Sequence, residues 1–101
     1  MSFLNHNQIE DYNNKGYVSP INIFSKQEAK EIREEIEKIE KKWPEALTGL
    51  NRNYVHLISP VFDKICHNSK ILDAVESLIG KNILICGTTL FIKNPNEKGY
   101  V

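Results

Sequence analysis

The stretch Asn82–Lys93, NILICGTTLFIK, decides which fold class the sequence predicts. Branched and aromatic side chains dominate it, and such residues favour extended backbone. Up to about Gly87 both alternating faces are apolar, whereas beyond it the odd-numbered face gains a hydroxyl at Thr89 and an amine at Lys93. A strand that is buried on both faces and turns polar at one end is typical of a sheet that runs into a pocket. We therefore predict a long strand over residues 82–93.

Two shorter segments upstream are also predicted to be strands. Tyr17–Ile21 (YVSPI) is extended by composition, and Pro20 places it near a sheet edge because proline has no N–H for a ladder. Asn53–Ile58 (NYVHLI) is β-branched and aromatic enough for a short strand. A sheet with a doubly buried strand needs more partners than these segments supply.

The most secure helix is predicted to start after Ser25. This serine forms a capping-box pattern with Glu28, and apolar residues then recur at spacings of three and four up to Trp43. Pro44 should end the helix, because proline disfavours helical geometry at the preceding residue. The opposite face carries charges of both signs, which is typical of a solvated surface.

Three further helices are predicted from caps and stop residues. For the first helix, Asn5 and Gln8 are the predicted cap and Gly16 is the predicted end. Pro60 suits the first turn of a short helix over 61–66. The last helix is predicted to start at Ser69 and to end at Gly80. The whole chain, residues 1–101, is predicted to form part of one domain.

Composition excludes several classes of partner. Thirteen basic residues balance thirteen acidic ones, so no long-range field favours nucleic acid or an anionic membrane. No apolar run approaches the about 20 residues of a membrane helix, and the N-terminus lacks a signal-peptide pattern. Two cysteines are too few for a disulfide framework, so we expect a cytoplasmic protein.

The residues themselves contain no complete active site. Cys66, Cys86, His56 and His67 lack the spacing of a zinc site, and small buried hydrophobic residues are the alternative interpretation of both cysteines. We interpret His56 as a strand residue with an ordinary hydrogen-bond partner. The sequence has no nucleophile–base pattern, and its five glycines are isolated rather than grouped in a phosphate loop.

Three stretches together resemble the N-terminal part of the phytanoyl-CoA dioxygenase family. They are IEDYNNKGYVSPINIFSKQEAKEIREEIEKIE (9–40), VHLISPVFDKICHNSKILDAVESLIGKNILI (55–85) and GTTLFIKNPNEKGYV (87–101). Each is moderately specific, but their order and spacing match the family over essentially the whole chain.

The resemblance implies an α+β fold: N-terminal helices plus the first strands of a truncated double-stranded β-helix core, the jelly-roll or cupin-like architecture. In this family the loop after Phe-x-Lys, here Phe91 and Lys93, leads into the His-x-Asp pair that binds Fe(II), and the chain stops at Val101 before it. The complete protein would therefore be an oxidoreductase, a dioxygenase that uses Fe(II) and 2-oxoglutarate to hydroxylate a small organic substrate. The fragment alone, which holds no catalytic residue and no metal ligand, should be inactive.

Four residues are candidates for binding the 2-oxoglutarate co-substrate by this resemblance. Alternation along the strand places Thr89, Phe91 and Lys93 on the face that the family turns toward the co-substrate. Arg52 is the nearest match to a basic family residue, although Tyr54 occupies the other candidate position. Ordinary sheet packing is the alternative for Thr89 and Phe91, and solvent exposure is the alternative for the two cations.

The sequence is also compatible with two other functions. A related halogenase would carry a small residue in place of the aspartate, so that chloride could bind the iron. A non-enzymatic helical module would instead use the apolar stripe over Ile32–Ile39 to bind a partner protein.

Overall fold

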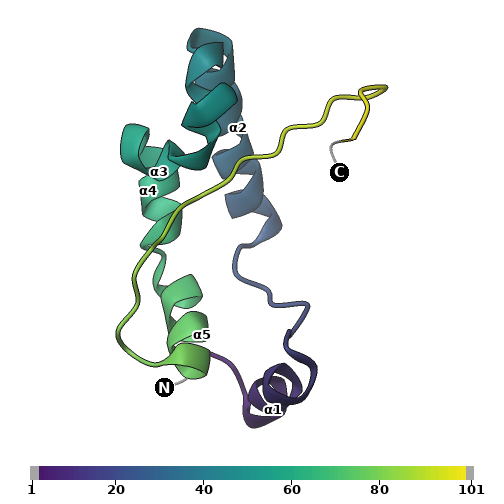
Figure 1. Cartoon of the computed structure of the whole chain (residues 1–101), viewed down its shortest axis with the longest axis vertical. Coiled ribbons are helices and arrows are strands. Elements are labelled where there is room, and N and C mark those ends of the chain that lie inside the picture. The colour runs from purple at the N-terminus through teal and green to yellow at the C-terminus, as the bar shows by residue number, and fades with distance from the viewer. Residues whose placement is uncertain (1–2, 100–101) are drawn as a thin grey trace.

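The computed structural model describes residues 3–99, and helices account for all of the regular structure in that range. Figure 1 shows the long α2 beside α3 and α4, with α1 and α5 toward the opposite end of the molecule. The elements in chain order are α1 (His6–Lys15), α2 (Lys26–Lys42), the short 3-10 helices η1 (Pro44–Leu47) and η2 (Gly49–Asn53), α3 (Val55–Ile58), α4 (Pro60–Cys66) and α5 (Ser69–Ile79).

The expected α+β fold with the first strands of a double-stranded β-helix is wrong for residues 3–99. None of the three segments expected to be strands joins a sheet there. Tyr17–Ile21 is a connection between α1 and α2 without regular structure. The prediction failed because branched residues favour extended backbone only where a neighbouring strand accepts and donates the ladder hydrogen bonds.

The segment Asn53–Ile58 is helical rather than extended. It contains the end of η2 and the whole of α3, and the Ser59 N–H donates to the Val55 carbonyl at 3.1 Å. The Leu57 N–H likewise donates to the Tyr54 carbonyl at 2.9 Å. These local bonds satisfy backbone groups without any partner strand, which explains why β-propensity did not decide the structure.

The starts and stops of α1 and α2 were predicted correctly. Ser25 Oγ accepts from the Glu28 N–H at 3.1 Å, and the Ser25 N–H donates to the Glu28 carboxylate at 2.7 Å. Asn5 and Gln8 form the same reciprocal pair at the start of α1, with both bonds at 2.9 Å. Gly16 ends α1 with a positive φ of 81°, a conformation that glycine adopts at little cost.

The second half of the helical part also follows its predicted signals. Pro60 lies in the first turn of α4, where its missing N–H costs no helical bond, and Gly80 follows the end of α5. The cap of α5 is Asn68, whose side chain accepts from the N–H groups of Lys70 and Ile71 at 3.0 and 3.2 Å.

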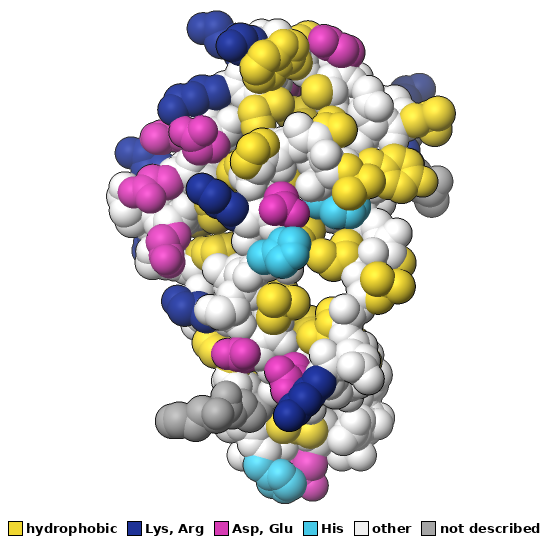
Figure 2. Space-filling view, turned by 90° about the vertical axis from the view of Figure 1, so that its left-hand side faces the viewer, with side chains coloured by type: hydrophobic (Ala, Val, Ile, Leu, Met, Phe, Trp, Pro, Cys, Tyr) yellow, Lys and Arg dark blue, Asp and Glu magenta, His cyan; other side chains and the backbone are white. Residues whose placement is uncertain are grey.

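The main core joins α2 to the helices that follow it. Leu47, Val55 and Phe62 are buried at its centre. Partly buried side chains from α2, α4 and the C-terminal segment pack around them: Ile36, Ile39, Val61, Ile65 and Leu90. This small core leaves many large apolar side chains in contact with solvent, and Figure 2 shows them spread across one face of the molecule.

The C-terminal segment, residues 81–99, runs in an extended conformation past the helices and away from them at its far end (Figure 1). The Thr88 N–H donates to the Asn53 carbonyl at 3.2 Å, and the Leu90 N–H donates to the Arg52 carbonyl at 3.0 Å. The segment is therefore extended, as its composition suggests, but it is held by η2 rather than by a strand.

Within residues 3–99, no helix combines the length and the apolar character that crossing a membrane requires.

Candidate functional site

Three of the four predicted co-substrate residues line one hollow. Arg52, Phe91 and Lys93 surround a space of about 250 Å³, together with Ile92 and Gly99. The fourth, Thr89, is exposed and does not line this hollow. The hollow thus joins side chains that are some 40 positions apart in the sequence.

Local geometry explains how these side chains meet. Arg52 belongs to η2, and its own carbonyl accepts the hydrogen bond from the Leu90 N–H, which holds the C-terminal segment beside it. Side chains alternate along an extended chain, so Leu90 packs against the core while Phe91 is 71% exposed. The anchoring of Leu90 therefore sets where Phe91 lies.

The Arg52 guanidinium lies over the Phe91 ring, with its central carbon 5.4 Å from the ring centroid. This separation is within the range of a cation–π contact. Neither Arg52 nor Lys93 forms an ion pair within residues 3–99. Two cationic side chains without anionic partners, beside an aromatic wall, form an arrangement suited to a small anion with more than one carboxylate.

A tight turn lies between Lys93 and Gly99, two of the residues that line the hollow. The Asn94 side-chain amide and backbone N–H donate to the Glu97 carboxylate at 2.9 and 3.1 Å, and Asn96 has a positive φ of 67°. The hydrogen bond from the Asn94 side chain, followed by the one from its backbone, lowers the pKa of Glu97. This carboxylate forms no ion pair with Lys93 within residues 3–99.

Sequence reasoning missed a contact between His56 and Thr88. His56 Nδ1 lies 2.9 Å from Thr88 Oγ1 in a partly buried position. The expectation of an ordinary hydrogen-bond partner for His56 is met, but from α3 rather than from a strand. The alternation of side chains along the predicted strand had pointed to Thr89 rather than Thr88 as a site residue. No local pattern connects His56 with Thr88, because they are 32 positions apart.

The cysteines and histidines that were considered for a zinc site, Cys66, Cys86, His56 and His67, do not form a metal-binding group. In the part of the chain that the structure describes, no group of three or more His, Cys, Asp or Glu residues is placed to hold a metal ion. His67 Nδ1 instead lies 2.9 Å from the Asp63 carbonyl within α4. Both cysteines are free thiols; Cys66 is half-buried, whereas Cys86 is exposed, so its interpretation as a buried hydrophobe was wrong.

Comparisons with models of protein families, with curated proteins and with solved structures found no match to this chain.

Proposed function

We propose that this chain is the N-terminal part of an Fe(II)- and 2-oxoglutarate-dependent oxygenase of the phytanoyl-CoA dioxygenase family. In the complete enzyme, Arg52, Phe91 and Lys93 would bind 2-oxoglutarate, and a small organic substrate would be hydroxylated. The observation that carries the proposal is the convergence of two cations without anionic partners on one hollow of about 250 Å³.

The charges around the hollow suit 2-oxoglutarate. The co-substrate is a short dicarboxylate, and a guanidinium presents paired N–H donors that match the two oxygens of a carboxylate. Lys93 would supply a point charge for the second carboxylate, and Phe91 would cover one side of the carbon chain. When bound, 2-oxoglutarate supplies the reducing equivalents that activation of O₂ requires, while the residues of this chain bind and orient it.

The residues described here do not fit Fe(II). Non-haem iron in this class of enzyme takes two histidines and one carboxylate, and no such group occurs within residues 3–99. We therefore propose that the iron ligands lie in residues outside this chain. The choice between hydroxylation and halogenation depends on one of those ligands, and we propose hydroxylation. The two free cysteines suit a reducing compartment, and we propose that the enzyme is cytoplasmic.

Binding of 2-oxoglutarate to the purified chain tests the proposal. NMR titration without iron should give weak binding, on the order of millimolar, with shifts at the amides of Arg52, Phe91 and Lys93. Exposed charge pairs contribute little, so Arg52→Gln and Lys93→Gln should each weaken binding about two- to fivefold. Lys81→Gln is the matched control, because this exposed lysine does not line the hollow.

Two results would contradict the proposal. Equal effects of Lys81→Gln and Lys93→Gln would mean that the dicarboxylate is attracted without a defined site. Saturable, Fe(II)-dependent binding in the micromolar range would mean that the chain itself holds the iron ligands.

A second candidate, a non-enzymatic interaction module, is favoured by a different observation. Ile32 and Ile36 of α2 border an open groove of about 550 Å³, which Ile92 and Pro95 of the C-terminal segment also line. This function predicts no preference for 2-oxoglutarate over a monocarboxylate such as 2-oxobutyrate. The same titration with both acids therefore separates the two functions.

A further inference from the structure

The extended C-terminal segment has one edge that is open to solvent. On its other edge, the N–H groups of Thr88 and Leu90 bond to carbonyls of η2. Successive residues of an extended chain direct their N–H and C=O groups to opposite edges, so those of Gly87, Thr89 and Phe91 lie on the open edge. None of these three N–H groups forms a hydrogen bond within residues 3–99, and all three residues are exposed.

The sequence of the segment does not protect this edge from pairing. Exposed strand edges in soluble proteins usually carry a charged residue, a proline or a bulge that blocks another strand. Residues 82–92 contain neither a charged residue nor a proline; Lys93 and Pro95 are the first to follow. Large apolar side chains, among them Leu84 and Phe91, are exposed along it. An uncharged, apolar and extended edge is a template for a second extended chain.

A second copy of the same segment matches this edge. Two antiparallel copies related by a twofold axis bring identical open edges together, so the free N–H and C=O groups of both are satisfied at once. The other edge of each copy is already bonded to η2 through Thr88 and Leu90. The pairing therefore closes at two copies and does not continue into a longer sheet.

Charge and side-chain size favour one register of this pairing. If the twofold axis passed through Gly87, Lys81 would lie opposite Lys93, and like charges directly opposite each other are unfavourable. With the axis at Thr89, no two lysines are opposed, and Phe91 of each copy lies opposite Gly87 of the other. An aromatic side chain opposite a glycine covers backbone that the glycine leaves exposed, and it stabilises the strand pair.

We propose that two copies of this chain pair in antiparallel fashion along residues 85–93, with the twofold axis at Thr89. The backbone of Thr89 bonds to Thr89 of the other copy, and that of Gly87 bonds to Phe91. A single pair of short strands buries little surface, so the dissociation constant should be on the order of 0.1–1 mM, and the dilute chain is monomeric. This dimer does not rest on the oxygenase proposal.

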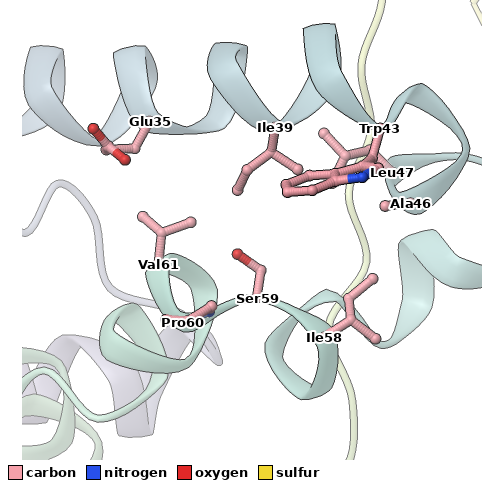
Figure 3. Close-up of a pocket in the computed structure, with 9 residues that line it drawn as sticks. All are labelled: Glu35, Ile39, Trp43, Ala46, Leu47, Ile58, Ser59, Pro60 and Val61. Atoms are coloured by element: carbon pink, nitrogen blue, oxygen red, sulfur yellow. The ribbon is translucent and has the colours of Figure 1, made fainter.

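Association through another apolar surface has to be distinguished from this pairing. The largest such surface surrounds a cavity of about 510 Å³ between α2 and α4, where Figure 3 shows Ile39 and Trp43 facing Ile58 and Val61. None of the residues that line it belongs to the segment 81–99. Trp43 is the only tryptophan, so its indole N–H signal reports contact at the cavity separately from contact at the segment.

Sedimentation equilibrium and NMR of the unaltered chain test the dimer. From about 10 µM to about 1 mM, the mean mass should rise toward that of a dimer. Over the same range, the amides of Thr89 and Phe91 should shift more than the Trp43 indole. In a mixture of isotope-labelled and unlabelled chain, a filtered spectrum should connect Hα of Thr88 with Hα of Leu90 in the other copy, because this pair lies between the hydrogen-bonded pairs.

Substitution at the twofold axis tests the register, because Thr89 lies opposite itself. Thr89→Lys and Thr89→Glu each place like charges opposite one another and should each weaken the dimer about two- to fivefold. A mixture of these two variants should associate at least as tightly as the unaltered chain. Asn82→Lys is the matched control, since it adds the same charge to the same segment outside the paired residues, and it should leave the affinity unchanged. Far-UV circular dichroism checks that each variant retains its helices.

Four outcomes would overturn the proposal. It fails if the unaltered chain is still a monomer at about 1 mM, a measurement that depends on no variant folding. Species larger than a dimer would show that more than one edge of each chain is open. Equal weakening by Asn82→Lys and Thr89→Lys, or a larger shift at the Trp43 indole than at the Thr89 amide, would place the contact elsewhere. If the mixed Lys and Glu variants associate no better than each variant alone, the axis does not pass through Thr89.

Discussion

The helical part of the molecule, residues 3–80, and the extended C-terminal segment, residues 81–99, satisfy their backbones in different ways. In the helices, each turn bonds to the next, and the first turns of α1 and α2 are closed by capping boxes. The extended segment is attached to the helical part through the N–H groups of Thr88 and Leu90, which bond to η2. A helix forms its backbone hydrogen bonds within its own sequence, whereas an extended chain needs a neighbouring segment to form them.

Side-chain burial differs in the same way. Val55 and Phe62 of the helical part are 2% and 7% exposed, whereas Leu84 and Phe91 of the segment are 90% and 71% exposed. Composition alone does not explain this contrast, since apolar residues make up a similar fraction of the segment and of the helical part. What differs is whether a second element covers the side chain.

The largest expected effect on stability comes from replacing a phenylalanine by alanine in each of the two regions. Phe62→Ala should lower the free energy of unfolding by about 3–5 kcal/mol, because it leaves a cavity in the main core. Phe91→Ala should change it by less than about 0.5 kcal/mol, since most of the ring is in solvent. Urea unfolding followed by circular dichroism measures both. Comparable losses for the two variants would show that the C-terminal segment is part of the cooperative core.

A smaller loss of stability is expected in the extended segment, where side chains alternate between the helical part and solvent. Thr88→Val removes the partner of His56 and should destabilise the chain by about 1 kcal/mol. Thr89→Val, one position along on the exposed side, should have almost no effect. Hydrogen exchange provides a second measurement: the amides of Thr88 and Leu90, which bond to η2, should exchange more slowly than those of Thr89 and Phe91. Equal protection of all four amides would contradict this register.

The smallest expected effect concerns pH at the start of α2. The hydrogen bond from the Ser25 backbone, followed by that from its hydroxyl, holds the pKa of Glu28 below its ordinary value of 4.5. The unfolded chain therefore binds a proton more readily than the folded one, so this contribution to stability is present above about pH 4.5 and is lost as the pH falls through the lowered pKa.

NMR titration of the Glu28 side-chain carboxyl carbon measures that pKa directly. In Ser25→Ala the midpoint should rise, because the hydroxyl bond is removed while the backbone bond remains. An unchanged midpoint would mean that the capping box does not set the charge of Glu28.

The candidate site was predictable in part, because the alternation of side chains along an extended segment depends only on neighbouring residues. Alternation along an extended chain placed Phe91 and Lys93 on a common side, and both line the hollow. The same alternation wrongly grouped Thr89 with them, since it does not line the hollow. Arg52 was proposed from the family resemblance, and only the bond from Leu90 to η2 shows how it reaches Phe91.

The buried Ser59 hydroxyl had no signal in the sequence. Its burial depends on how the helices pack together, and a serine before a proline is otherwise typical of an exposed turn. The contact between His56 and Thr88 was invisible for the same reason.

By itself, the sequence determined where α1 and α2 begin and end, because Ser25, Asn5, Gly16 and Pro44 act on backbone groups a few residues away. Only the tertiary structure decided that the branched segments would not form a sheet, and that Arg52 would meet Phe91 and His56 would meet Thr88. The physical reason is range: caps and stops satisfy hydrogen bonds within one turn, whereas strand pairing and cavities depend on elements that are distant in the chain.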